Sequence, residues 1–181
     1  ALKETLDALG IEKCGIWGSH TGATIAIEFC VRYPERVSIF VTDGYPAYDD
    51  ATRQDMLKYH VPPYQPKWDG SHLLLTWHKF REMFIFSPTF RWHKENRTNS
   101  APPPPHIIQH MILPRLITGE SYTHAYAAVF RYEPLKPVQA LKVPSCFGAR
   151  SDDSLIKGFS LIKPLLPQDC WLEEISADKD K

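Results

Sequence analysis

The first 45 residues alternate between helix-like and strand-like patterns of hydrophobic positions. Leu2, Leu6 and Leu9 share one helical face, and Gly10 is a natural helix stop. Two short apolar runs, residues 13–18 (KCGIWG) and 37–42 (VSIFVT), are typical of strands buried on both faces. The segment between them, residues 21–33, is rich in Ala and Ile, which predicts a helix.

The C-terminal residues repeat this pattern. Residues 143–148 (VPSCFG) and 170–176 (CWLEEIS) are predicted strands, and residues 154–166 between them are a predicted helix. The charged tail, residues 177–181, is expected to fray. Strands that alternate with helices indicate an α/β fold with a mostly parallel sheet and right-handed crossovers.

The middle of the chain has a different composition. It holds twelve of the sixteen prolines and seven of the eight histidines, and its periodic segments, residues 73–86 and 107–131, predict helices. The proline run at 102–105 is interpreted as a stiff linker rather than a peptide ligand. We therefore divide the chain into a first core segment (1–45), a helical insertion (46–137) and a second core segment (138–181).

Composition excludes several classes of function. Lys plus Arg equals Asp plus Glu at 21 each, so the sequence has no electrostatic footprint for nucleic acid or an anionic membrane. No apolar stretch approaches the length of a membrane span, and the N-terminal residues do not resemble a signal peptide. The four cysteines lack metal-site spacing and are interpreted as buried thiols of a cytoplasmic protein, with no cofactor and no metal.

The sharpest motif is Gly18-Ser19-His20-Thr21-Gly22, between a predicted strand and a predicted helix. A nucleophile elbow has small residues two positions before and two after its apex, because its turn is tight. Gly18 and Gly22 satisfy this spacing with His20 at the apex. Ser19 is rejected as the apex, because Trp17 would then collide with the turn. Histidine is among the residues that tolerate the positive φ expected at the apex.

This elbow and its surroundings resemble the α/β-hydrolase superfamily. The resemblance covers residues 6–44, including Arg32-Tyr33-Pro34-Glu35-Arg36-Val37, and the strand and turn from Val143-Pro144 through Gly148 to Asp152-Asp153. It implies a partial α/β-hydrolase fold, and by its position the helical insertion resembles the superfamily's cap domain. About half of the chain is covered well.

The sequence also departs from this superfamily. Its members usually have Ser, Asp or Cys where this chain has His20, and a catalytic histidine shortly after the last strand, whereas no histidine follows His124 here. The first strands of the fold are missing as well. We therefore expect a fragment that is inactive alone and exposes an apolar sheet edge.

The resemblance implies roles for several residues. The backbone N–H of Thr21 would stabilise an oxyanion. Asp152, or alternatively Asp153, would orient a histidine, with Asp152 slightly favoured; the competing interpretation is an N-cap of the following helix. Asp43 is a further candidate acid, although a turn residue is the commoner interpretation.

His20 has three interpretations. It acts as a nucleophile or general base, it polarises a substrate, or it is the relic of a lost nucleophile. In the insertion, His106 and His110 stand at i, i+4, but no carboxylate completes a metal-binding arrangement. His72, Trp68 and Trp77 are candidate substrate-binding residues, with core packing as the alternative for the tryptophans.

The sequence thus predicts, in the full-length form, a hydrolase that acts on a small, mostly apolar ester or related substrate. The alternative is a non-catalytic binding or interaction protein on the same fold. The sequence leaves the oligomeric state open.

Overall fold

The computed structural model describes residues 1–61, 64–98 and 100–177, so residues 178–181 of the predicted fraying tail lie outside the described residues. The chain forms two compact units. One combines Ala1–Asp50 with Tyr132–Lys181, and the other is Ala51–Arg131. We call them the sheet unit and the helical unit.

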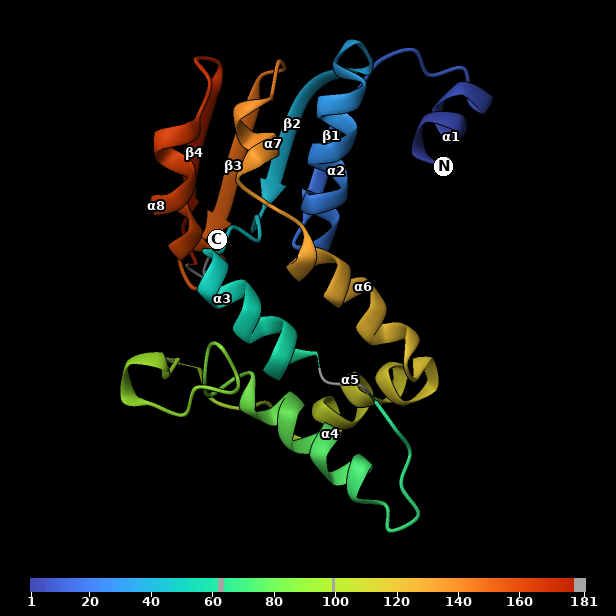
Figure 1. The fold of residues 1–181 in the computed structure, drawn as a ribbon, viewed down its shortest axis with the longest axis vertical. Helices are drawn as coiled ribbons and strands as arrows, with labels where there is room; N and C mark the ends of the chain where they lie inside the picture. The colour runs from blue at the N-terminus through green and yellow to red at the C-terminus, as the bar shows by residue number, and fades with distance from the viewer. Residues whose placement is uncertain (62–63, 99, 178–181) are drawn as a thin grey trace. The chain divides into compact units, whose positions relative to one another are not determined.

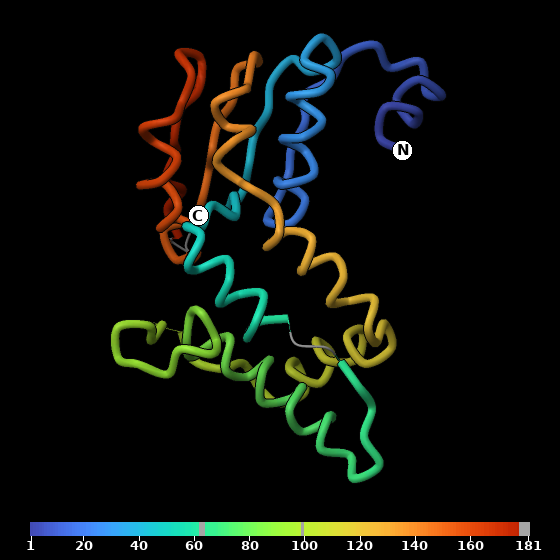
Figure 2. Tube along the Cα trace, in the orientation of Figure 1, coloured from blue at the N-terminus to red at the C-terminus, as the bar shows by residue number. Residues whose placement is uncertain are grey.

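A four-stranded parallel sheet forms the centre of the sheet unit. Its strands are β1 (Cys14–Ser19), β2 (Val37–Asp43), β3 (Ser145–Arg150) and β4 (Cys170–Ile175), hydrogen-bonded in the order β1-β2-β3-β4. Every neighbouring pair is parallel. Strands from the two ends of the chain therefore lie side by side in one sheet (Figure 2). The prediction of a mostly parallel α/β sheet flanked by helices is confirmed.

Helices cover one face of this sheet (Figure 1). They are α2 (Thr21–Arg32), α7 (Lys136–Gln139) and α8 (Phe159–Ile162). Apolar side chains meet between these helices and the strands, because burial removes them from water. Within this core, Phe147 contacts both Phe40 and Tyr45 in edge-to-face geometry, with ring centroids 5.9 and 5.3 Å apart.

The opposite face of the sheet carries exposed apolar residues. Trp17, Val41, Cys146 and Trp171 are register partners across the four strands and form one row. Trp17 is 66% exposed and Trp171 is 43% exposed. The sheet therefore has one covered face and one on which large apolar side chains contact solvent.

The N-terminal helix α1 (Leu2–Ala8) is held to the sheet unit by Arg36, at the end of the short 3-10 helix Pro34–Arg36. The Arg36 guanidinium donates hydrogen bonds to the Asp7 carboxylate at 2.7 Å and to the backbone carbonyls of Ile11 and Glu12 at 2.8 and 2.6 Å. A guanidinium has donors on three nitrogens, and here all three are used. Arg36, one residue of the Arg32–Val37 motif, thus has a structural role.

The helical unit contains α3 (Asp50–Asp55), which begins at the last residue of the sheet unit's first segment, and a π-helical turn (Met56–His60). It continues with α4 (Ser71–Glu82), a 3-10 turn (Lys94–Asn96), α5 (Pro105–Thr118) and α6 (Ser121–Arg131). A small core of Phe80, Ile108 and Ile112 joins α4 to α5, and Trp77 packs against it.

Two predicted helices differ from the structure. Residues 107–131 form two helices rather than one, because Gly119 turns the chain at a positive φ of 58°. Residues 154–166 form two 3-10 segments (Ser154–Gly158 and Lys163–Leu165) on either side of α8. Pro164 lacks the N–H that a continuous α-helix would use there.

The cysteines differ only partly from the expectation of buried thiols. All four are free, but only Cys30 is fully buried, while Cys14, Cys146 and Cys170 are partly exposed. Among the residues that the structure describes, no helix combines the length and apolar character needed to cross a membrane.

The fold predicts that the stability of the protein depends strongly on the Phe147 side chain. We expect Phe147→Ala to lower the free energy of unfolding by about 3–5 kcal/mol, because the side chain is completely buried and a cavity would remain. Ile25→Ala on α2 is the matched control: Ile25 is 63% exposed, so its truncation should change stability little. Denaturant unfolding measures both, and an equal loss in the two variants would contradict this core.

Candidate active site

His20 lies at a tight turn between the end of β1 and the start of α2. Its backbone has φ 49° and ψ −115°, a conformation that residues with a side chain rarely adopt. The turn requires glycine at position 18, because a Cβ there would lie 2.7 Å from the Cα of Ala23. The positive φ expected for His20 is therefore present in the structure.

Gly22 has no such steric requirement. A Cβ at this position would meet nothing within 4 Å outside its own helix. The expected need for a small residue thus has a physical basis at Gly18 but none at Gly22 in this structure.

The His20 side chain pairs with Asp153, which follows β3. His20 Nε2 lies 3.0 Å from Asp153 Oδ2, and the side chains are 57% and 14% exposed, respectively. The imidazole is therefore accessible from solvent, whereas the carboxylate is mostly enclosed. Because Asp153 accepts the hydrogen bond, we assign the proton to Nε2, which leaves a lone pair on Nδ1.

Asp153 has a second contact. Its Oδ1 accepts a hydrogen bond from the backbone N–H of Leu155 at 2.9 Å, which caps the 3-10 helix Ser154–Gly158. The N-cap interpretation of this residue is thus correct, and the same carboxylate also contacts His20. Asp152, the slightly favoured acid, instead forms two hydrogen bonds with the Arg150 guanidinium at 2.9 and 2.8 Å.

Backbone carbonyl groups at the end of β2 hold the turn at His20 in place. The His20 N–H donates to the carbonyl oxygens of Asp43 and Gly44 at 3.2 and 3.0 Å. Gly44 has a φ of 72°, and a Cβ there would lie 2.9 Å from Asp153 Oδ2 and 3.1 Å from His20 Nε2. Gly44 therefore permits the close approach of the pair. The sequence by itself predicted no role for Gly44; its place after a buried strand, in the dipeptide Asp43-Gly44, was the available signal.

The pair shifts both pKa values. The hydrogen bond with Asp153 raises the pKa of His20; partial burial lowers it, and the charges of Asp153 and Asp43 raise it, for a net increase. Burial raises the pKa of Asp153, but the hydrogen bonds from His20 and from the Leu155 N–H outweigh this effect, and the net pKa is lowered. Each shift favours the charged form of its group.

Thr21 is the first residue of α2, so its backbone N–H is one of the donors that no carbonyl of the helix accepts. The helix N-terminus also carries partial positive charge. Within the described residues, no group forms a hydrogen bond with His20 Nδ1. An exposed imidazole nitrogen, an enclosed carboxylate and a helix N-terminus thus lie at the carboxyl edge of a parallel sheet, where ligands of open α/β sheets commonly bind.

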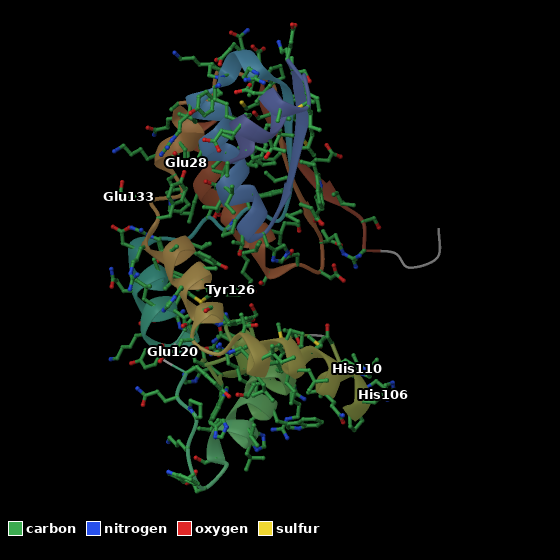
Figure 3. All side chains as sticks on the ribbon, turned by 90° about the vertical axis from the view of Figure 1, so that its right-hand side faces the viewer. Glu28, His106, His110, Glu120, Tyr126 and Glu133 are labelled. Carbon is green, nitrogen blue, oxygen red and sulfur yellow. The ribbon has the colours of Figure 1, made fainter. Side chains whose placement is uncertain are left out.

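The remaining candidate residues belong to the helical unit. His72, on α4, accepts a hydrogen bond from the Lys67 N–H at 3.0 Å, and Trp77 packs on the small helical core, in line with its core interpretation. Trp68 is fully exposed. His106 and His110 lie one turn apart on α5 (Figure 3), and the His106 carbonyl oxygen is 2.7 Å from His110 Nδ1. Among the described residues, no three His, Cys, Asp or Glu side chains gather closely enough to hold a metal ion.

Comparison with known proteins identifies the fold. No protein-family model and no curated protein matches the sequence. Solved structures do match. They include epoxide hydrolase A from Mycobacterium thermoresistibile, at 17% identity and a TM-score of 0.61, covering 98% of this chain and 66% of that one.

Two further similar structures have other activities in their names. Est816, an N-acyl homoserine lactone degrading enzyme, is 15% identical with a TM-score of 0.58 and covers 97% of this chain and 63% of its own. A meta-cleavage product hydrolase from Pseudomonas fluorescens is 14% identical with a TM-score of 0.51 and covers 97% of this chain and 60% of its own. This chain therefore has a partial α/β-hydrolase fold, and it spans between half and two thirds of the length of these structures.

The geometry of the site predicts that the small size of Gly44 helps to raise the pKa of His20. We expect Gly44→Ala to lower the pKa of His20 toward its ordinary value of about 6.5, because the added methyl group separates the imidazole from Asp153. Gly10→Ala is the matched control, since Gly10 also has a positive φ of 66° but has nothing within 4 Å of an added Cβ. NMR titration of the imidazole measures both variants. An unchanged pKa in Gly44→Ala would contradict the pairing.

Proposed function

We propose that the protein that carries this chain is a hydrolase for a small, mostly apolar ester or related substrate, with His20 and Asp153 as its catalytic pair. The observation that carries this proposal is the 3.0 Å contact between the exposed, strained His20 and the enclosed Asp153. An imidazole that is oriented by a carboxylate and free at its other nitrogen is suited to proton transfer. The similarity to hydrolase structures supports the fold of this proposal but not its chemistry.

In the proposed reaction, His20 acts as the general base. Its Nδ1 removes a proton from a water molecule while the water oxygen attacks the carbonyl carbon of the ester. Asp153 stabilises the resulting imidazolium, as an aspartate does in a Ser-His-Asp system. The Thr21 N–H stabilises the oxyanion. The imidazolium then returns the proton to the departing alkoxide, so that ester and water yield acid and alcohol.

General-base catalysis fits the geometry better than direct attack by His20. The less hindered ring nitrogen, Nε2, is occupied by Asp153, and only Nδ1, next to the Cβ substituent, is available. Direct attack would instead give an acylated imidazole and a burst of the first product, which stopped-flow measurement detects.

We assign substrate selection to the helical insertion, as the counterpart of a cap domain, with His72, Trp68 and Trp77 as its contacts. Trp68 is the best position for a test, because its full exposure means that its removal leaves the helical core intact.

The first experiment concerns the acid. In hydrolysis of a short-chain nitrophenyl ester, we expect Asp153→Asn to lower kcat/KM by about 10²–10⁴-fold, the usual contribution of general acid–base catalysis. His20→Ala should abolish turnover while ligand binding remains measurable. The baseline for this comparison is the rate given by an equal concentration of free imidazole. Asp152→Asn should retain turnover, because its carboxylate faces Arg150. If the unaltered protein binds esters without turnover, the non-catalytic alternative replaces this proposal.

The pH dependence of the same reaction is a separate prediction. Only neutral His20 has a lone pair on Nδ1, so kcat/KM should rise with pH and level off. Because Asp153 raises the pKa of His20, the midpoint should lie above about 6.5. In Asp153→Asn the midpoint should fall along with the rate. A profile that decreases with pH would rule out His20 as the base.

Substrate selection is tested by Trp68→Ala. We expect KM to rise severalfold with kcat unchanged, because a contact made equally in the ground and transition states affects only binding. Trp92→Ala is the control, since Trp92 is also exposed on the helical unit, at 71%. The same KM in the unaltered protein and both variants would remove Trp68 from the substrate site.

A further inference from the structure

The helical unit contains one buried and two partly buried basic side chains, none of which belongs to the His20 site. Arg115, on α5, is only 6% exposed. Lys79, on α4, donates a hydrogen bond to the backbone carbonyl of His60, the last residue of the π-helical turn. We call Arg115, Lys79 and His60 the basic cluster.

Tyrosine rings enclose the Arg115 guanidinium. Its Cζ lies 4.7 Å from the centroid of the Tyr64 ring and 4.5 Å from that of Tyr122. Tyr126, labelled on α6 in Figure 3, stacks beside Tyr122 with ring centroids 5.1 Å apart and lies 6.1 Å from the His60 ring. One Arg115 nitrogen donates to the Gly119 carbonyl. Its other N–H groups have no hydrogen-bond partner among the described residues.

The pKa values in the cluster show that positive charge is costly there. Burial lowers the pKa of Lys79 to about 8, and the nearby Arg115 charge contributes to the decrease. Burial lowers the pKa of His60 to about 4, with a contribution from Lys79. His60 Nδ1 is buried and has no hydrogen-bond partner within the described stretches of the chain. Arg115 keeps its charge at all ordinary pH values.

In the part of the chain that the structure describes, no carboxylate forms an ion pair with Lys79 or Arg115. By contrast, other arginines of the same unit pair with acids, Arg81 with Glu82 and Arg91 with Asp55. Removing a charge from water without an opposite charge beside it is unfavourable, so a bound anion would stabilise this arrangement.

We propose that the helical unit binds a small oxyanion, a carboxylate or phosphate group, at Lys79 and Arg115. The guanidinium offers a fork of parallel N–H donors, and the ammonium has two donors left after its bond to His60. The tyrosine rings fix the guanidinium orientation before binding. This site does not rest on the proposed hydrolysis, because its residues are separate from His20 and Asp153.

The experiment measures thermal unfolding of the protein with increasing acetate or inorganic phosphate, against chloride at the same ionic strength. A ligand that binds only the folded state raises the melting temperature in a concentration-dependent manner. We expect this increase with acetate, phosphate or both, and the more effective anion identifies the ligand chemistry. Lys79→Met and Arg115→Met should each weaken binding by about tenfold or more, the value of one charge-assisted hydrogen bond.

Two further variants make the result specific. Lys58→Met removes a lysine of the same unit whose side chain is exposed and lies 4.8 Å from the Tyr59 ring; the anion effect should persist in it. Lys79→Arg keeps the charge and should retain binding.

A measurement on the unaltered protein tests the proposal even if the variants fail to fold. The Lys79 pKa, measured by NMR in the unaltered protein, should rise from about 8 when the anion is added. An unchanged Lys79 pKa, or an anion effect equal in Lys79→Met and Lys58→Met, would overturn the proposal.

Discussion

Close packing of three backbone turns at the carboxyl edge of the sheet is the constraint on which the site depends. The backbone at the start of α2 leaves no room for a side chain at Gly18, near the end of β1, and the His20 and Asp153 side chains leave none at Gly44, after β2. The His20 N–H is held by the Asp43 and Gly44 carbonyls. Because these parallel strands end at one edge, the backbone of His20 is held in place there. Its imidazole can therefore contact Asp153, which follows β3.

The two units differ in whether the charged groups removed from water have partners of opposite charge. In the sheet unit, Asp153 is mostly enclosed, but both of its oxygens have partners, His20 and the Leu155 N–H, so its ionised form is stabilised. In the helical unit, Arg115 is buried and Lys79 is partly buried without a carboxylate partner among the described residues, and the pKa of Lys79 is lowered. The charge distribution of the first pair suits the proton transfer that we propose for it, and that of the basic cluster suits the anion binding that we propose there.

The histidine at the turn between β1 and α2 changes what the proposed mechanism requires from the rest of the fold. Where a serine apex needs a separate base, His20 is itself basic and contacts the acid directly. In the proposed mechanism the Asp153 carboxylate orients His20 itself rather than a third residue. The same geometry would also persist in a protein that binds without catalysis, since Asp153 has a structural role as the cap of the following helix. Chemistry at His20 is therefore decided by turnover and not by the contact alone.

The sequence by itself determined the strands, the tight turn with a positive φ at His20, and the parallel α/β class, because these depend on local patterns of apolar residues and glycine. It left Asp152 and Asp153 unresolved, since the choice depends on which side chain points across the sheet edge and which faces Arg150. It also missed the break at Gly119 and the basic cluster. Lys79 and Arg115 are far apart in sequence, and the tertiary packing of the helical unit buries Arg115 and partly buries Lys79.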